Sequence, residues 1–435
     1  MRDRGQSPTT RSTSPRALAA IALAANSVGW RVSGGPLRVA ILNPTFWPEV
    51  RRGSERFIRD LADGLIARGH VPTLITSHPG PPGRTLEDGL TVIRHWRPPD
   101  GRLRRRMFEE HLTHVPFSYM SLRAGSFDVA HALYPTDALA AARWRANTGR
   151  PAVLSYMGVP HRRSLANRRR RLEVTVRAFH DSSAVVVLSE AAAAASERWL
   201  GVRPRVIAPG VDLAAFAPGV AGAAGAAGAA GAAGAAGAAS AASAASAAGG
   251  GRAAVPTFVC AAALGVPRKR VELLIEAFVL VRRRRADARL ILSRPAARAD
   301  AALGDVIPPG VEFADLDDRA ALAAAYRRAW VSVLPSVGEA FGLVLAEALA
   351  CGTPGVGTRD GGIPEVLDRP EIGRMFDGEE PAALAAAMLE ALDLATAPGT
   401  ARACRARAEE LSIDRCVERY LALYRELGAG EPRPP

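Results

Sequence analysis

The sequence predicts two α/β domains, each built on a doubly wound parallel sheet, joined by a linker. Three observations favour this fold. The chain has 435 residues, which is too long for one ordinary domain. Short apolar runs alternate with amphipathic stretches of helical period along most of it. A tract of glycine, alanine and serine over 219–251 divides this alternation into two series.

Before the first predicted element lies a segment, 1–36, that is rich in Arg, Ser, Thr and Pro. Its apolar run at 17–25 is too short to span a bilayer, although it resembles the core of a signal peptide. We favour the simpler interpretation, which is a disordered or over-long N-terminal extension.

The first domain is expected to span 37–212 and to begin with a buried strand at 37–42. A helix with apolar residues at helical spacing follows at 54–68, Gly69 ends it, and 71–76 is the next strand. Strand, helix and strand in this order form a βαβ unit, which requires a parallel sheet. The other strands expected in this domain are 127–131, 152–156, 184–188 and 205–208.

The tract over 219–251 carries a glycine at every third position from Gly219 to Gly237, and serines then keep the same period. It has no proline to support a collagen helix, and a glycine in every turn disfavours an α-helix. We therefore expect a flexible linker with no catalytic role.

The second domain is expected over 252–410, where the alternation resumes. Strands are predicted at 257–261, 289–292, 330–334 and 355–358, and helices at 271–285, 319–328, 343–350 and 381–392. The segment 411–435 holds a last amphipathic helix, 413–427, that either domain could receive.

The amino-acid composition limits the classes of binding partner that we expect. The net charge is +13, and Lys269 is the only lysine among 56 basic residues, so the charge is almost all arginine. No basic stripe with interleaved aromatics and no nucleic-acid-binding motif occurs, so we expect no nucleic acid as partner. An acidic small ligand such as a sugar diphosphate, or an anionic membrane surface, fits equally well. Four scattered cysteines argue against a disulfide framework or a zinc site and favour a reducing compartment.

Ligands of open α/β sheets bind at the carboxyl ends of the strands, which here means the cleft between the domains. The loop after strand 330–334 runs into a helix whose first amides favour a phosphate. Glu339 in this loop and Glu347 in the helix are expected to face the cleft and to accept hydrogen bonds from sugar and ribose hydroxyls. The phosphate-binding amides would be those of Phe341, Gly342 and Leu343.

Other strand-end loops add candidates. Lys269, with Arg268 beside it, would bring a compact positive charge to a diphosphate, although a solvated basic turn has the same composition. Gly362 would let the backbone approach a ligand, or would simply belong to a tight turn. Gly53, at the start of the first helix, is another possible phosphate contact. The triplet 315–317 is interpreted as a turn and helix cap, because its two aspartates directly precede a helix.

His131 ends a predicted strand and could reach the cleft as a catalytic residue, although a lone histidine is more often structural. Serine-nucleophile elbows, Walker loops and a Gly-x-Gly-x-x-Gly after the first strand are absent from the sequence.

Taken together, the motifs at 338–354 and 361–365 resemble the retaining GT-B glycosyltransferases of family 4, which carry a Glu-x7-Glu signature in the second domain. Further matches lie at 56–62 with 67–70, at 209–212 and at 269–278. The resemblance implies two Rossmann-like domains facing each other across a cleft, with the last helix crossing back to the first domain.

The resemblance also implies roles. Glu339 would hold the donor sugar, Glu347 the ribose, and Lys269 with the loop amides the diphosphate of a UDP- or GDP-sugar. The first domain would bind an acceptor, which could be a sugar, a lipid or a small molecule. The anomeric configuration would be retained through front-face attack, with no metal or other cofactor. Many relatives act at the cytoplasmic membrane face, so the expected location is cytoplasmic, and the arginine runs at 102–106 and 168–171 could contact anionic lipid.

Three positions depart from the family pattern. The segment 260–264 has no arginine, so Arg268 or Arg270 would substitute for it. A Gly-Gly pair of the family is Arg-Gly at 52–53, and Leu133 and Met157 stand where histidine is common. A catalytically degenerate nucleotide-sugar-binding protein is therefore the alternative. An epimerase on the same fold is disfavoured because the cleft offers few paired acids and bases.

Overall fold

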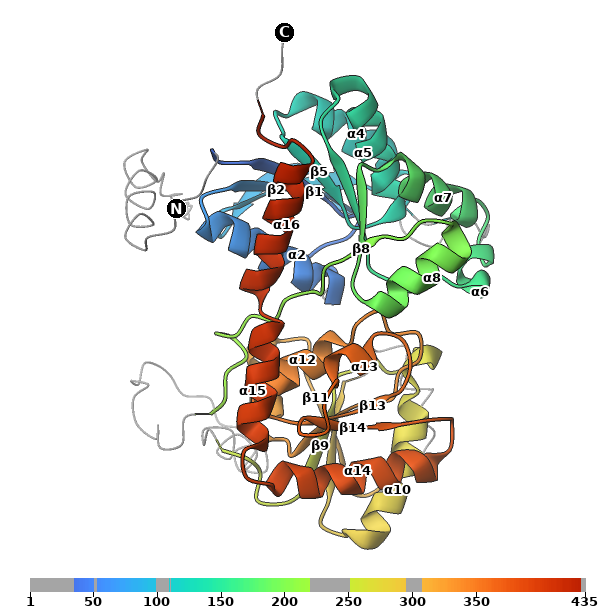
Figure 1. Cartoon of the computed structure of the whole chain (residues 1–435), viewed down its shortest axis with the longest axis vertical. Coiled ribbons are helices and arrows are strands. Elements are labelled where there is room, and N and C mark those ends of the chain that lie inside the picture. Colours follow the sequence, from blue (N-terminus) through green and yellow to red (C-terminus); the bar gives the residue numbers. More distant parts are fainter. Residues whose placement is uncertain are drawn as a thin grey trace, which may run out of the picture.

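The computed structural model describes residues 35–50, 53–98, 109, 111–219, 251–294 and 307–431, and shows two lobes, one above the other in Figure 1. Each lobe is a sheet covered by helices on both faces, which confirms the predicted fold class. The extension at 1–34 and nearly all of the predicted linker lie outside the described residues.

The first domain has an eight-stranded sheet in the order β3-β4-β2-β1-β5-β6-β7-β8, parallel except for the β3–β4 hairpin. The sequence pattern did not predict this hairpin, because the side chains of β3 have no buried face. The strands are β1 Arg38–Leu42, β2 Val71–His78, β3 Gly83–Glu87, β4 Leu90–Trp96, β5 Val129–Ala132, β6 Ala152–Tyr156, β7 Ala184–Val187 and β8 Arg205–Val206.

Helix α2, Gly53–Ala67, begins and ends within one residue of its prediction. Helices α5 and α8 were missed because half of their buried side chains are alanine, so their apolar period has little contrast. The remaining helices of this domain are α4 His114–Ala124, α5 Pro135–Thr148, α6 Arg162–Ala166, α7 Arg171–Asp181 and α8 Glu190–Leu200.

The second domain has a six-stranded sheet, all parallel, in the order β11-β10-β9-β12-β13-β14. The four predicted strands are confirmed within one residue at each end. The strands are β9 Thr257–Cys260, β10 Arg289–Ser293, β11 Val311–Ala314, β12 Val331–Leu334, β13 Gly355–Thr358 and β14 Gly373–Phe376.

The helices of the second domain follow the strands as the βαβ pattern requires. They are η3 Pro267–Lys269, α10 Val271–Arg284, α11 Arg319–Arg328, α12 Leu343–Ala350, α13 Ile363–Val366, α14 Pro381–Thr396 and α15 Thr400–Glu410. No single helix among the described residues has the length and apolarity to cross a membrane. Only α14 and α15 taken together pass that test, with a bend of 102° between them, and half of the residues of α14 are buried in the core.

Both sheets place their first strand in the middle. In the first sheet the chain adds β2 and then β4 on one side of β1, and it returns to add β5 on the other side. In the second sheet β10 and β12 lie on the two sides of β9 in the same way. Each sheet therefore has a topological switch point, between β1 and β5 and between β9 and β12. The loops that leave the carboxyl ends of these strands are where open α/β sheets bind ligands.

The last helix, α16 (Ile413–Glu426), returns to the first domain and packs on α2 (Figure 1). The chain crosses where Val211 and Ser412 form a β-bridge. Gly64 allows the helices to meet, because a Cβ at this position would lie 2.5 Å from Cγ2 of Val417. The contact buries Val417 and Tyr420 completely.

A buried polar network fastens α16 to the sheet. His131 on β5 contacts Ser155 Oγ through Nε2 at 2.7 Å and Tyr424 OH through Nδ1 at 2.7 Å. Ser155 Oγ in turn lies 2.8 Å from Tyr420 OH. The expectation that His131 reaches the cleft is wrong, because its side chain points between the sheet and α16 and is fully buried. Burial also lowers the pKa of His131 to about 3.

The depressed pKa of His131 predicts a pH-dependent stability. The unfolded imidazole protonates near 6.5 and the folded one near 3, so the unfolded state binds more protons between these values. Stability is therefore complete above pH 6.5 and falls as the pH decreases, by about 2 kcal/mol at about pH 5. Urea unfolding across this range should show a clearly smaller pH slope in His131→Gln than in the wild type. The exposed His180 is the control, and equal slopes for His131→Gln and His180→Gln would contradict the prediction.

Candidate active site

The loops after β9 and β12 meet at the switch point of the second sheet, and they bring Lys269 and Glu339 together. Lys269 Nζ lies 2.5 Å from Glu339 Oε2, and an Arg268 guanidinium nitrogen lies 3.3 Å from the same oxygen. The backbone also joins the loops, since the Val337 amide donates to the Arg268 carbonyl at 2.9 Å. Three residues predicted from two separate loops therefore form one cluster.

The charges of this cluster hold Glu339 ionised. Burial alone would raise the pKa of the carboxyl group, but the charges and hydrogen bonds of Lys269 and Arg268 outweigh it, so the pKa lies below its ordinary value. An ionised carboxylate accepts hydrogen bonds and is not poised to donate a proton. The geometry therefore suits the binding of hydroxyl groups better than general acid chemistry.

Arg270, the other candidate to replace the family's missing arginine, has a structural position. Its guanidinium donates to the carbonyls of Pro335 and Gly378 at 2.7 and 3.0 Å and to Thr358 Oγ1 at 3.0 Å. It therefore ties three loops together. Arg268, whose side chain is 51% exposed and pairs only with Glu339 among the described residues, is the arginine that can reach a ligand.

Two glycines position the Glu339 loop. Gly361 has a φ of +59°, and a Cβ there would lie 2.3 Å from the Glu339 carbonyl oxygen. A Cβ on Gly362 would lie 2.5 Å from the Ala340 carbonyl oxygen, while the Gly362 amide donates to the Glu339 carbonyl at 2.8 Å. The close approach predicted for Gly362 is therefore made with the neighbouring loop, and its effect on a ligand acts through Glu339.

The start of α12 lies beside this loop. Gly342 caps the helix with a φ of +104°, a backbone conformation that side chains rarely adopt, and the helix begins at Leu343 as predicted. The first amides of a helix have no intrahelical partner and form its positive end. Phe341, only 3% exposed, anchors the turn that presents these amides.

Glu347 lies one turn into α12 but is not open to the cleft. Its side chain is 4% exposed and contacts an Arg56 guanidinium nitrogen of α2 at 3.6 Å and Tyr326 OH at 3.4 Å. Burial raises the pKa of the carboxyl group, although Arg56 and Arg319 oppose this. The side chain therefore points toward the first domain, as expected, but Arg56 and the surrounding residues of that domain cover it in this structure.

Further ion pairs cross the boundary between the two domains, which we call the seam. Arg319 on α11 contacts Asp60 of α2 at 2.6 Å and Asp212 at 3.1 Å. Burial raises the pKa of Asp60 to about 6 even though Arg319 opposes the shift. On another part of the seam, Glu365 of the second domain accepts hydrogen bonds from the first two amides of α8 at 2.9 and 3.0 Å. The facing surfaces are thus matched in charge.

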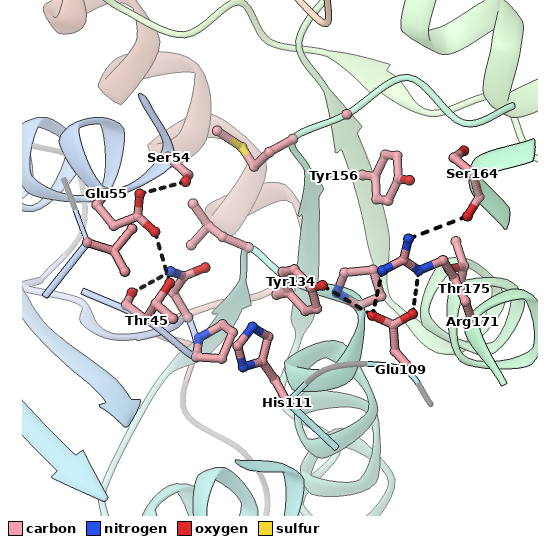
Figure 2. A pocket seen from close by; sticks show the side chains of 17 residues that line it. Thr45, Ser54, Glu55, Glu109, His111, Tyr134, Tyr156, Ser164, Arg171 and Thr175 are labelled. Atoms are coloured by element: carbon pink, nitrogen blue, oxygen red, sulfur yellow. Dashed lines mark hydrogen bonds and ion pairs between the residues drawn. The ribbon is translucent and has the colours of Figure 1, made fainter. Parts of the chain in front are cut away.

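The first domain contains a cavity of about 440 Å³ at its own switch point, lined by loops that follow β1, β5 and β6. Glu55 and Ser54, from the first turn of α2, line one side of it, and Thr45 Oγ1 donates to Glu55 at 3.0 Å (Figure 2). Gly53 begins this helix, as predicted. Leu133 and Met157, which replace the family's histidines, also line the cavity.

A second polar cluster lies on the opposite side of this cavity. Arg171 makes a two-point ion pair with Glu109, and Tyr134 OH donates to Glu109 at 3.2 Å (Figure 2). The arginine run at 168–171 is therefore partly engaged inside the domain, while the run at 102–106 lies outside the described residues. No motif in the sequence indicated this cavity, although the strand-end rule points to its loops.

Two sets of residues with metal-binding or redox chemistry prove structural. The triplet at 315–317 forms the predicted turn, in which the Asp317 amide donates to Asp315 Oδ1 at 3.2 Å, and Asp318 caps α11. Within the described ranges, no group of three His, Cys, Asp or Glu side chains is arranged to hold a metal. All four cysteines are free and buried.

Two family models match the chain, one for each domain. The model described as Glycosyltransferase Family 4 matches residues 51–215, and that described as Glycosyl transferases group 1 matches residues 255–393. Sucrose-phosphate synthase from Thermosynechococcus elongatus has a similar structure, with a TM-score of 0.72 and 21% identity over 91% of this chain and 100% of its own. Anabaena HepE, solved with UDP and glucose, has a TM-score of 0.64 and 16% identity over 90% and 100%.

The two facing Rossmann-type sheets and these structural neighbours give the chain the GT-B fold, and both family models that match it describe glycosyltransferases. More narrowly, its first domain is of the family 4 type and its second of the group 1 type.

Curated relatives match over shorter segments. The D-inositol 3-phosphate glycosyltransferase of Acidothermus cellulolyticus is 40% identical over 101 residues, which are 23% of this chain and 22% of the relative. The enzyme of the same name from Pseudarthrobacter chlorophenolicus is 37% identical over 172 residues, 36% and 39% of the two chains. The match thus spans well under two thirds of the length of these relatives.

The contact of Gly362 with the Glu339 loop predicts a stability effect. Gly362→Ala should lower the free energy of unfolding by about 1 to 3 kcal/mol, because the added methyl meets backbone atoms that cannot rotate away. Gly251→Ala is the matched control, since a Cβ there meets nothing within 4 Å. Urea denaturation of both variants tests this, and a tolerated Gly362→Ala would show that the loop has room to move.

Proposed function

We propose that the protein transfers a sugar from a nucleotide diphosphate sugar, with UDP and GDP as candidate carriers, to an acceptor bound in the first domain. Transfer proceeds with retention of the anomeric configuration. The observation that carries the proposal is the cluster of Lys269, Arg268 and Glu339 beside the start of α12, at the switch point of the second sheet. Similar structures support it, since HepE was solved with UDP and glucose and a trehalose-6-phosphate protein of E. coli with UDP-2-fluoro glucose.

In this proposal the diphosphate of the donor replaces Glu339 as the partner of Lys269 and Arg268. The diphosphate takes the positive charge of Lys269 and Arg268 and the amides of Phe341, Gly342 and Leu343. The carboxylate of Glu339 is then released to accept hydrogen bonds from hydroxyls of the donor sugar. Because the cations already lie where charge develops on the departing diphosphate, they stabilise the transition state without reorganising.

The proposed ribose site at Glu347 requires a change at the seam. Arg56 and Tyr326 contact Glu347 only at 3.6 and 3.4 Å, so the carboxylate has unused capacity to accept hydrogen bonds. A ribose reaches it when α2 moves away from α12. Donor binding would therefore be coupled to opening of this part of the seam.

The acceptor is proposed to occupy the cavity lined by Glu55, Tyr134 and Tyr156. Its volume of about 440 Å³ is within the range of small-molecule sites. His131 is buried and held neutral, so it does not serve as the general base. The acceptor proton instead passes to the oxygen of the leaving phosphate, and the protein contributes mainly positioning and charge stabilisation.

We propose a cytoplasmic location because four buried, unpaired thiols suit a reducing compartment. Contact with an anionic membrane surface stays a proposal, and it rests mainly on arginines outside the described residues. Co-sedimentation with anionic vesicles at low and high salt tests it.

Replacement of Glu339 tests the transfer activity. Glu339→Gln keeps the shape of the side chain but removes the charge that pairs with Lys269, and it should lower sugar transfer on the order of 100-fold. The assay supplies a panel of nucleotide sugars with candidate acceptors, and circular dichroism checks the fold. The control is Glu312→Gln, which removes a carboxylate from the surface of β11.

Two results would contradict the proposal. Unchanged transfer by Glu339→Gln would refute the site. Saturable nucleotide binding by the wild type without transfer or donor hydrolysis would instead support the alternative, a binding protein on the same fold.

Replacement of Lys269 tests the diphosphate contact separately. Lys269→Met should weaken binding of a nucleoside diphosphate at least about tenfold, because a charge-assisted contact to phosphate is lost. Binding of the corresponding nucleoside, which has no phosphate, should change little. Calorimetry with both ligands distinguishes this result from a general loss of binding, which would indicate that Lys269 acts by supporting the loop.

A further inference from the structure

A second cavity, of about 500 Å³, lies on the seam between the domains and is separate from the pocket of the first domain. Its walls come from α8 and β8 of the first domain, from the loop holding Phe341, and from the ends of α13 and α15. Figure 1 shows α8 in the upper lobe and α13 in the lower lobe, on the two sides of this seam. An occupant of this cavity would contact both domains.

One face of α16 supplies the remaining wall. Ser412, at the N-cap, and Arg415, Cys416 and Arg419 line the cavity, and their spacing of three, four and seven residues puts them on one stripe of the helix. Val417 lies on the other side of α16 and packs against α2. The fold thus directs two arginines, one turn apart, toward the same space.

The acidic residues that line the cavity are already engaged. Glu365 accepts two hydrogen bonds from the first amides of α8, at 2.9 and 3.0 Å. Glu410 accepts from Arg407 at 2.5 Å, and Glu190 pairs with Arg203 at 3.3 Å. Within the described chain, none of these three carboxylates forms a salt bridge with Arg415 or Arg419.

The acidic neighbours on α16 are engaged as well. Asp414 and Glu418 both pair with Arg68 of the first domain, at 2.8 and 3.6 Å. Arg415 and Arg419 themselves have no acidic partner among the described residues. Arg415 and Arg419, which are both exposed, thus present to this cavity two positive charges that no ion pair holds.

We propose that this cavity binds a small, soluble, phosphate-bearing anion, held mainly by Arg415 and Arg419. The planar guanidinium group offers paired donors that match phosphate oxygens, and two of them one helical turn apart can grip two oxygens or two phosphate groups. The site shares only Phe341 with the proposed donor site, and its ligand would favour one arrangement of the two domains.

Equilibrium dialysis of the full-length protein with labelled inorganic pyrophosphate tests this site. The wild type should bind two pyrophosphates per chain, one at the proposed donor site and one in the seam cavity. Arg415→Gln/Arg419→Gln should lose one of the two, with the affinity of that class reduced at least about tenfold. The matched control, Arg283→Gln/Arg284→Gln, removes the same charge from the exposed end of α10 and should keep both.

The variants test the seam site and the proposed donor site separately. Only the donor site depends on the proposed function. Lys269→Met should lose the donor-site pyrophosphate and keep the seam pyrophosphate. Unchanged binding by Arg415→Gln/Arg419→Gln, or an equal loss in the α10 control, overturns the seam site. Unchanged binding by Lys269→Met, with a loss in the α16 variant, overturns the donor site and leaves the seam site standing.

Discussion

The arrangement of the two domains depends on the docking of α16 in the first domain. The helix leaves the second domain at Ser412, buries its apolar face on α2, and is fixed by the hydrogen bonds of Tyr420 and Tyr424 to Ser155 and His131. A buried polar network of this kind stabilises the fold only when each member is satisfied, because an unpaired group in the core is costly. The second domain is therefore attached to the first through a buried, hydrogen-bonded contact.

The rest of the seam differs in kind from this contact. It consists of ion pairs and caps, such as Arg319 with Asp60 and Glu365 with the start of α8. The cost of removing water from charged groups at a domain interface offsets much of the attraction between them. Such contacts therefore determine how the two domains are positioned more than they add stability. The molecule thus combines a buried attachment at α16 with a seam of polar contacts, and the proposed donor binding at Glu347 requires some of these polar contacts to break.

The proposed donor cluster could be predicted because backbone topology alone determines it. The loops after the first and fourth strands of a doubly wound sheet must meet at the switch point, so Lys269 and Glu339 converge once the strands are identified. The pocket of the first domain follows the same rule, but its lining has no motif. Helices α5 and α8 escaped prediction because alanine provides little contrast between a buried and an exposed face.

The sequence by itself determined the α/β class, the two domains and the loops that carry Lys269, Glu339 and the start of α12. It could do so because apolar period and strand-end position are local properties of the chain. Only the tertiary structure decided that His131 faces α16, that Glu347 is covered by Arg56, and that Arg415 and Arg419 lack partners. The physical reason is that each of these depends on which surface of a distant element arrives opposite the side chain, and local sequence does not contain that information.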